Sequence, residues 1–533
     1  MIRTSVSPDG KFTVALHRPS YTIANLRTYD QITVLGHTED GTSCDNRNNF
    51  PAGDVPVSGA KPIYEIPNAF PFRGTTFIDS EWADRKAADP ATITLAPAGE
   101  CSLREVLNKH LDTERQKAVM ADLPIQLLYG LAANSTDPEE LVRLAQSCCR
   151  MEYTQAGEPC GLRFVRGGDG KHRPDVDDFE LFETIANNPF LPDPYKEVMV
   201  LRPGVQGGSE IVGEWESGES HVFEYLRSNS YIPWGHFAAN MAHDAIRYRT
   251  SELSLADMQG LRHLYYQRVY ITLAEKAGIS LPVRRTRLSV AQLEKLRQEI
   301  LAAVNARTEH LATLWGWNFG YDFSSSGYRL HASHQMIHQQ YALVPETVPT
   351  IDEKEEIPAF SSGDLVAEVI DRYRSETGHD FFDDFLTALR SNTRTDRQEG
   401  DQSLVVWEDE NAVLFVPKAQ VSQWELQLLL KADSAGGPVG NVLEADTGTR
   451  QSMDRAILLA QQIYAGQNAR MVSSFEFSKR VGVRNGQRLI YSFLPKLPWS
   501  MGAFSEAQLR FICGHYPEDF AACCRLQLNK KNL

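Results

Sequence analysis

The stretch RLHASHQMIHQQYALVP, residues 329–345, concentrates three histidines and three glutamines in a hydrophobic segment that is typical of a β-strand. His331, His334 and His338 are three of only 14 histidines in the chain. If the strand begins at Ser333, successive side chains point to opposite faces of a sheet. One face then carries His334, Met336, His338 and Gln340, and the other carries Ile337 and Tyr341.

Three interpretations fit this polar face. Its side chains can simply hydrogen-bond to one another at the sheet surface. They can bind zinc, but a zinc site needs three or four converging ligands, and no CxxC or HExxH motif joins His331 and His334. A neutral imidazole can also attack a phosphorus atom and carry the transferred group as a phosphoramidate. That chemistry needs a donor to the phosphoryl oxygens, and Gln340 follows His338 on the same face.

Composition narrows the class of protein. The 533 residues are enough for two or more domains, and 42% hydrophobic with 23% charged residues is typical of a soluble globular protein. The start, MIRTSVSPDGK, has no apolar signal core, and no apolar run is long enough to span a membrane. The net charge of −15 argues against nucleic acid as a partner. We therefore expect a cytoplasmic protein that binds neither nucleic acid nor membrane.

The eight cysteines do not indicate a redox motif or a metal site. None of them forms a CxxC pair. In a reducing compartment, buried free thiols are the expected state.

The sequence ASHQMIHQQYAL, residues 332–343, resembles the active-site strand of the histidine-triad superfamily. The similarity is to the branch of galactose-1-phosphate uridylyltransferases and diadenosine tetraphosphate phosphorylases, whose pattern is S-x-x-H-x-H-x-Q. The resemblance implies that His338 is the nucleophile, that Gln340 binds a phosphoryl oxygen, and that Ser333 contacts a substrate phosphate. Met336 replaces the first histidine of the pattern, and His334 is a candidate to compensate for it in the substrate site.

A second segment resembles the first hairpin of the same superfamily. NSYIPWGHFAANMAH, residues 229–243, has the form N-x-x-x-P-x-G-H followed by a hydrophobic strand. The resemblance implies that Asn229 reads the ribose or base of a nucleotide, although an Asx turn explains this residue equally well. Asn68 in IPNAFP, and Asn187 with Asn188 in ANNPFLP, resemble a nucleotide loop of the uridylyltransferases, and turns explain these too.

The fold class that we expect is α+β, with two tandem histidine-triad-like antiparallel-sheet units and a mixed N-terminal extension. Residues 1–218 form the mixed region, 219–345 the first unit with the active-site strand, and 346–402 an acidic linker with a helix. Residues 403–533 repeat the order strand, turn, strand, helix, strand, strand, which suggests duplication. This second unit has LIYSFLPKLP where the uridylyltransferases have an H-x-H pair, so it is expected to be degenerate. Its hairpin SKRVGVRNGQR is either a second phosphate site or a solvated turn.

The expected function is nucleotidyl transfer or nucleotide phosphorolysis through a covalent nucleotidyl-histidine. The donor would be a nucleoside diphosphate sugar or a dinucleoside polyphosphate, and the acceptor phosphate or a sugar phosphate. The alternatives are a non-catalytic nucleotide-binding module, which Met336 favours, and a dinucleotide hydrolase. Because the zinc ligands of the uridylyltransferases are missing, we expect no bound metal or cofactor beyond possible magnesium on the substrate phosphates. A homodimer is one possible assembly.

Overall fold

The structure is a computed structural model. It describes residues 2–26, 32–96, 99–168, 170, 172–186, 188, 190–199, 213–214, 223–224, 237–238, 250–281, 288–304, 310–320, 338–498 and 501–530. None of the helices in these ranges is both long enough and apolar enough to cross a membrane.

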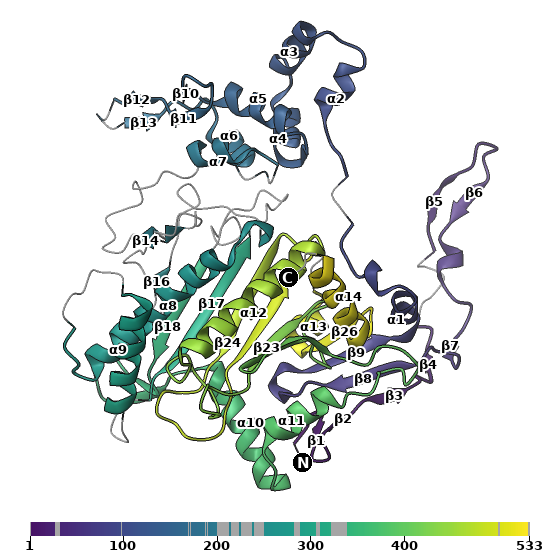
Figure 1. Ribbon diagram of the computed structural model, residues 1–533. Coiled ribbons are helices and arrows are strands. Elements are labelled where there is room, and N and C mark those ends of the chain that lie inside the picture. Colours follow the sequence, from purple (N-terminus) through teal and green to yellow (C-terminus); the bar gives the residue numbers. More distant parts are fainter. Residues whose placement is uncertain are drawn as a thin grey trace.

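An eight-stranded sheet, antiparallel throughout, forms the centre of the molecule (Figure 1). Its strand order is β16–β18–β17–β24–β25–β23–β22–β21, so strands from residues 237–344 form one side and strands from residues 405–495 the other. The strands are β16 (Phe237–Ala238), β17 (Ala312–Gly320), β18 (His338–Val344), β21 (Val405–Glu408), β22 (Ala412–Phe415), β23 (Leu426–Leu430), β24 (Met471–Phe477) and β25 (Ile490–Pro495). The chain is therefore α+β, as the sequence predicts.

One face of this sheet is covered by α8 (Leu255–Lys276), α9 (Val290–Ala303), α12 (Thr447–Gly466) and α14 (Pro517–Lys530), as Figure 1 shows. The largest hydrophobic core lies between them and includes alternate residues of β17, namely Trp315, Trp317 and Phe319. The start of α8 is set by its local sequence. Ser254 and Asp257 form a complete capping box, with each side chain accepting from the other residue's backbone N–H.

The opposite face is covered in part by α10 (Ser362–Thr377) and α11 (Phe381–Arg390). Phe381, Phe382 and Phe385 of α11 pack with Phe70 from the N-terminal region and Phe415 of β22. A short hairpin of β19 (Thr347–Pro349) and β20 (Glu356–Pro358) precedes these helices, within the acidic stretch predicted as a linker.

The first ninety-six residues form small sheets that join the C-terminal region. β26 (Arg510–Cys513) pairs in parallel with β9, in a four-stranded sheet of order β26–β9–β8–β3. Gly74 permits this contact, because a Cβ atom there would lie 2.1 Å from the Leu509 carbonyl oxygen. The elements are β1 (Val6–Ser7), β2 (Lys11–Phe12), β3 (Ala15–His17), β4 (Tyr21–Ile23), β5 (Val34–His37), β6 (Ser43–Asp45), β7 (Val55–Val57), β8 (Ile63–Pro67), β9 (Thr75–Asp79) and α1 (Ser80–Ala87), and α13 (Ala503–Gln508) precedes β26.

Residues 102–199 form a separate helical unit with its own hydrophobic core, drawn above the large sheet in Figure 1. Its helices are α2 (Leu103–Asn108), α3 (Thr113–Ala121), α4 (Ile125–Asn134), α5 (Pro138–Cys148), α6 (Phe179–Ala186) and α7 (Asp193–Met199). Two hairpins complete it, with strands β10 (Met151–Tyr153), β11 (Pro159–Leu162), β12 (Phe164–Arg166) and β13 (His172–Pro174). A further pair, β14 (Gly213–Glu214) with β15 (Phe223–Glu224), follows it in the chain.

In two segments the structure differs from what the local sequence pattern predicts. The helical pattern that begins at Ser289 continues to Leu314 in the sequence, but α9 ends at Ala303 and residues 312–320 are strand β17. Central pairing with β18 and β24 on both sides outweighs the helical propensity of this segment. Residues 197–199, predicted as the start of a strand, belong to α7, because Val198 and Met199 pack into the helical core of residues 102–199.

Candidate functional site

The strand predicted from Ser333 onward is present over the residues that the structure describes, as β18 (His338–Val344). Tyr341 and Leu343 lie in the core beneath the α8 face, whereas Ala342 and Val344 belong to a small cluster on the opposite face. Strand alternation therefore puts positions 338 and 340 in phase with Ala342 and Val344, on the face away from α8.

Only part of the predicted site lies among the residues that the structure describes. The backbone of His338 and Gln340 is placed, and their side chains lie outside the described part of the chain. Ser333, His334 and Asn229, together with Met336, lie outside the described residues altogether. The roles of these five predicted site residues therefore remain predictions.

The register of β17 adds two residues that sequence reasoning missed. Asn318 pairs with His338, and Gly316 pairs with Gln340. On the other side of β17 the same positions pair with Ser473 and Phe475 of β24. Ser473 Oγ donates to Asn318 Oδ1 at 2.9 Å, which holds this amide at the sheet surface. The alternation of large aromatic and small or polar residues in WGWNF, residues 315–319, is the sequence signal for this face.

Gly316 places no side chain on the sheet surface beside position 340. Among the described atoms, only the Ser474 carbonyl oxygen would lie within 4 Å of a Cβ atom built at Gly316, at 3.9 Å. Gly316, Asn318, Ser473 and Phe475 are all half-buried rather than covered. A glycine inside a central strand weakens the sheet, and it commonly marks a place where a ligand or another backbone approaches closely. This row is the candidate floor of a binding site.

A buried charge network lies behind the candidate floor. The guanidinium of Arg262 is fully buried on α8 and stands 4.6–5.0 Å from the ring centres of Tyr265, Tyr266, Trp315 and Tyr491. It donates to Tyr491 Oη at 2.7 Å and lies 3.4 Å from Asp454 of α12. Because the Tyr265 ring also contacts the Tyr341 ring of β18, with 5.8 Å between the ring centres, the network supports β18 from the core side.

The acids of this network hold their protons strongly. Burial raises the pKa of Asp454 to about 7, although Arg262 and the hydroxyl of Tyr266 oppose the shift. Burial likewise raises the pKa of Glu476, which accepts from the hydroxyls of Tyr265 and Tyr491 at 2.7 Å each. Both carboxyl groups thus cost the folded state free energy once they are ionised.

Asp454→Asn is expected to remove a pH dependence of stability. The folded chain binds the Asp454 proton more tightly than the unfolded chain, so this residue stabilises the fold most below pH of about 4 and progressively less up to about 7. The wild-type free energy of unfolding, relative to that of Asp454→Asn, should therefore fall by a few kcal/mol across this range. Chemical denaturation at a series of pH values measures it. A difference that grows with pH would mean that Arg262 holds Asp454 ionised.

Two other sequence signals have structural explanations. Asn68 forms an Asx turn, since it accepts from Phe70 N at 3.0 Å and its amide donates to Ala419 O at 3.3 Å. Asn188 accepts from Phe190 N at 2.8 Å and donates to two carbonyl oxygens; Asn187 lies outside the described residues. Asn68 and Asn188 therefore form turns, which the sequence allows as the alternative to a nucleotide loop.

The basic hairpin at residues 478–488 is largely occupied by ion pairs. Lys479 contacts Glu444 at 2.7 Å, and Arg480 binds Asp364 with two nitrogen atoms at 2.7 Å each. Both cations are buried. All three guanidinium nitrogens of Arg480 have hydrogen-bond partners, and the pair with Asp364 ties α10 to the segment after β24.

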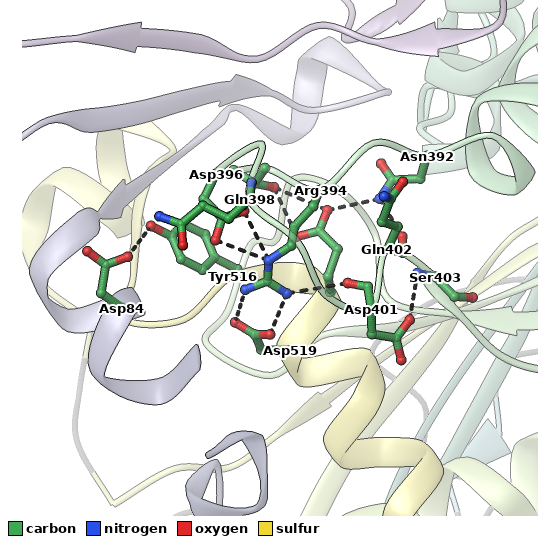
Figure 2. Close-up of polar contacts among 12 residues, drawn as sticks. Asp84, Asn392, Arg394, Asp396, Gln398, Asp401, Gln402, Ser403, Tyr516 and Asp519 are labelled. Carbon is green, nitrogen blue, oxygen red and sulfur yellow. Dashed lines mark hydrogen bonds and ion pairs between the residues drawn. The ribbon is translucent and has the colours of Figure 1, made fainter. Parts of the chain in front are cut away.

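A cavity of about 410 Å³ lies between α1, residues 394–401 and α14. Its central feature is Arg394, which binds Asp519 through two hydrogen bonds of 2.6 and 2.8 Å and also contacts Asp396 (Figure 2). Asp84 accepts from the hydroxyl of Tyr516, and Asp401 pairs with Arg525. Since these carboxylates already have partners, the cluster ties the loop to α14.

No group of three or more histidine, cysteine, aspartate or glutamate side chains is arranged to hold a metal ion within the part of the chain that the structure describes. His331 and His334 lie outside that part. The expectation of a protein without a resident metal therefore stays a prediction.

No protein-family model matches the chain, and no curated protein matches its sequence. Among solved structures, a GalT-like protein from Arabidopsis thaliana matches at 13% identity and a TM-score of 0.36, over 57% of this chain and 84% of that one. An ADP-glucose phosphorylase from Arabidopsis thaliana with bound ADP-glucose matches at 12% identity and a TM-score of 0.36, over 57% of this chain and 82% of that one. A uridylyltransferase mutant matches at 14% identity and a TM-score of 0.31, over 56% of this chain and 78% of that one. The names of these proteins belong to the branch that residues 332–343 resemble. Because the TM-scores are below 0.5, the activity of this chain has to be argued from its own residues.

Proposed function

We propose that the protein is a nucleotidyltransferase or nucleotide phosphorylase that works by double displacement. The imidazole of His338 attacks the α-phosphorus of a nucleoside diphosphate sugar or dinucleoside polyphosphate, and a nitrogen–phosphorus bond forms. The bond from that phosphorus to the bridging oxygen breaks, and the leaving group departs with the electron pair. An oxygen of phosphate or of a sugar phosphate then attacks the same phosphorus, and His338 is released.

The observation that carries this proposal is the register of β18 against β17. Positions 338 and 340 fall in the same strand phase, on the face opposite α8, and they pair with Asn318 and with the bare glycine at 316. A nucleophile needs open space above it for the substrate and neighbouring donors for the developing charge on phosphorus. The glycine at 316 and the amide of Asn318 beside positions 338 and 340 support this placement of the nucleophile.

Gln340 favours transfer over hydrolysis in this scheme. An amide donates a hydrogen bond to a phosphoryl oxygen and, unlike a histidine at the same position, does not titrate near neutral pH. The acceptor therefore has to bring its own nucleophilic oxygen. Ser333, His334 and Asn229 are proposed to contact the nucleotide, with magnesium possible on the substrate phosphates.

A substrate panel tests the proposal against its alternatives. Nucleoside diphosphate sugars, dinucleoside polyphosphates and adenylyl sulfate are each incubated with and without phosphate. A nucleotidyltransferase turns over a donor only when an acceptor is present. Equal turnover without phosphate would identify a hydrolase, and binding without turnover of any donor would identify a nucleotide-binding module.

Gly316→Val is expected to lower kcat/KM without weakening the fold. Its Cβ atom meets no described atom closer than 3.9 Å, and valine suits a strand better than glycine, so the melting temperature should hold or rise. The new side chain stands on the row between position 340 and Phe475, where it displaces substrate. A loss of about 10-fold or more is expected, since small misplacements of substrate have effects of this size. Gly316→Ala should give a smaller loss, and full activity of both variants would place the substrate elsewhere.

We also infer that the two sides of the large sheet arose by duplication. On one side the order is β16–β18–β17, with α8 between β16 and β17 in the chain. On the other side the order is β23–β25–β24, with α12 between β23 and β24. Strand for strand these are the same arrangement, and β17 meets β24 where the two sides join. The second side has no histidine on β25, so it completes the sheet without a second nucleophile.

A further inference from the structure

A cavity of about 370 Å³ lies beside α1, away from the candidate site on β18. Trp82, Arg85 and Lys86 of α1 form one side, and Thr94, Trp424 and His515 contribute to the rest. Trp424 lies two residues before the start of β23, which is four strands away from β18 in the sheet. At the usual strand spacing this is about 19 Å. The volume is within the range of small-molecule sites, roughly 300–1,000 Å³.

Among the residues that the structure describes, the charged side chains that line this cavity are the cations Arg85 and Lys86. The exposed Arg85 has no hydrogen-bond or ion-pair partner among the residues that the structure describes. Lys86 donates to the Thr92 carbonyl oxygen at 2.7 Å, which leaves its charge without a carboxylate in that same part of the chain. In a chain with a net charge of −15, two neighbouring cations without acidic partners make a local site for an anion.

His515 adds a buried donor whose orientation can be assigned. The side-chain oxygen of Gln420 accepts from Glu425 N at 3.2 Å, so its amide nitrogen is the atom that faces His515 Nε2 at 3.4 Å. Nε2 therefore accepts, and Nδ1 carries the hydrogen. Burial, together with the charge of Lys86, lowers the pKa of His515 to about 3, so the ring is neutral. His515 is only 2% exposed, and its Nδ1–H has no partner among the described residues.

An N–H that has no protein acceptor and belongs to a ring at a cavity wall is open to an acceptor supplied by a ligand. The ring lines the cavity, and an oxygen atom of a ligand there would satisfy it. The N–H of His515 and the cations Arg85 and Lys86 can all bind the same kind of atom, an anionic or carbonyl oxygen of a ligand.

Two indoles supply flat apolar surface to the same cavity. Trp82 is 50% exposed, and its ring is held beside the backbone of Gly514, where a Cβ atom would lie 3.8 Å from Cε3. Trp424 is buried and stacks on Phe520. An exposed tryptophan next to cations is suited to a ligand that joins a planar ring to a charged group.

We propose that this cavity is a second ligand site, which binds a planar aromatic ring that carries a phosphate group, of the size of a nucleoside monophosphate. The ring lies against Trp82, the phosphate meets Arg85 and Lys86, and a ligand oxygen accepts from His515. The site is separate from the row on β17 and β18, and it does not depend on the function proposed above.

Photolabelling with 8-azido-adenosine monophosphate tests this site on the full chain. Peptide mapping should find label within residues 80–96, 420–426 or 512–517, and adenosine monophosphate should protect these peptides. Adenosine and inorganic phosphate, each alone, should protect at least about 10-fold more weakly, since each makes only part of the contacts. Label confined to other peptides, or equal protection by adenosine, would overturn the proposal.

A variant at Arg85, compared with control variants outside the cavity, tests the contacts of the ligand. Arg85→Ala should weaken protection by about 10-fold or more, because one charge-assisted hydrogen bond is worth at least this much. Arg85 is exposed, so the fold is not at risk. Arg115→Ala removes an equally exposed arginine on α3 and should change nothing, and His338→Asn should also leave this labelling intact. Protection of Arg85→Ala that equals that of the wild type would contradict the site.

Discussion

His338→Asn is expected to abolish turnover while nucleotide binding is retained. Asparagine fills similar space and still hydrogen-bonds, but it cannot attack phosphorus. Loss of the nucleophile in a covalent mechanism costs on the order of 10⁴- to 10⁶-fold in kcat. Steady-state kinetics with the best donor of the substrate panel, together with the Kd for that donor by calorimetry, separates the two effects.

The matched control for this variant is His110→Asn. His110 is exposed in the turn after α2, so its loss should affect neither turnover nor binding. Turnover by His338→Asn at a rate near that of the wild type would remove His338 from the mechanism. The histidines of residues 331–338 would then be an ordinary polar sheet surface.

Gln340→Ala should reduce kcat by on the order of 100- to 1000-fold, which is the usual effect of losing one donor to a developing charge. The melting temperature should change little, because position 340 is paired with a glycine, which has no side chain that packs on Gln340, and water can fill the space. Gln339→Ala is the control on the same strand. Position 339 has the phase of Tyr341, toward the α8 face, so this variant should keep the kcat of the wild type.

Unfolding of Gln340→Ala would make Gln340 a structural residue. Circular dichroism melting curves of both glutamine variants distinguish this outcome from a catalytic one. Equal kcat losses in Gln339→Ala and Gln340→Ala would contradict the strand phase on which the site is built.

The strand phase of β18 was predictable because it depends on local alternation alone. Its partner β17 was not, because LAAVNARTEHLATL reads as a continuation of α9. Only pairing on both sides reveals residues 312–320 as a central strand. Asn318 was missed for the same reason, since its position opposite His338 depends on that pairing.

The network around Arg262 could not be predicted from sequence. From the sequence alone, Arg262 looks like one polar residue on the surface of a helix. In the structure its guanidinium is completely buried. The partners that make this burial tolerable are Asp454 and Tyr491, which are 192 and 229 residues further along the chain. Local periodicity carries no information at such separations, whereas β21, β22, α12, β24 and β25 followed from periodicity directly. Strand β23 and helix α14 were not predicted.

A labelled donor without acceptor tests the central claim most directly. A double-displacement enzyme must pass through a nucleotidyl-histidine, whereas a binding module or a water-activating hydrolase need not. The account predicts label on the wild-type chain that is lost in acid but survives alkali, as a phosphoramidate does. It also predicts that added phosphate discharges the label as a nucleoside diphosphate, and that His338→Asn takes up none. A wild-type protein that turns over donor at full rate without ever carrying label would contradict the account.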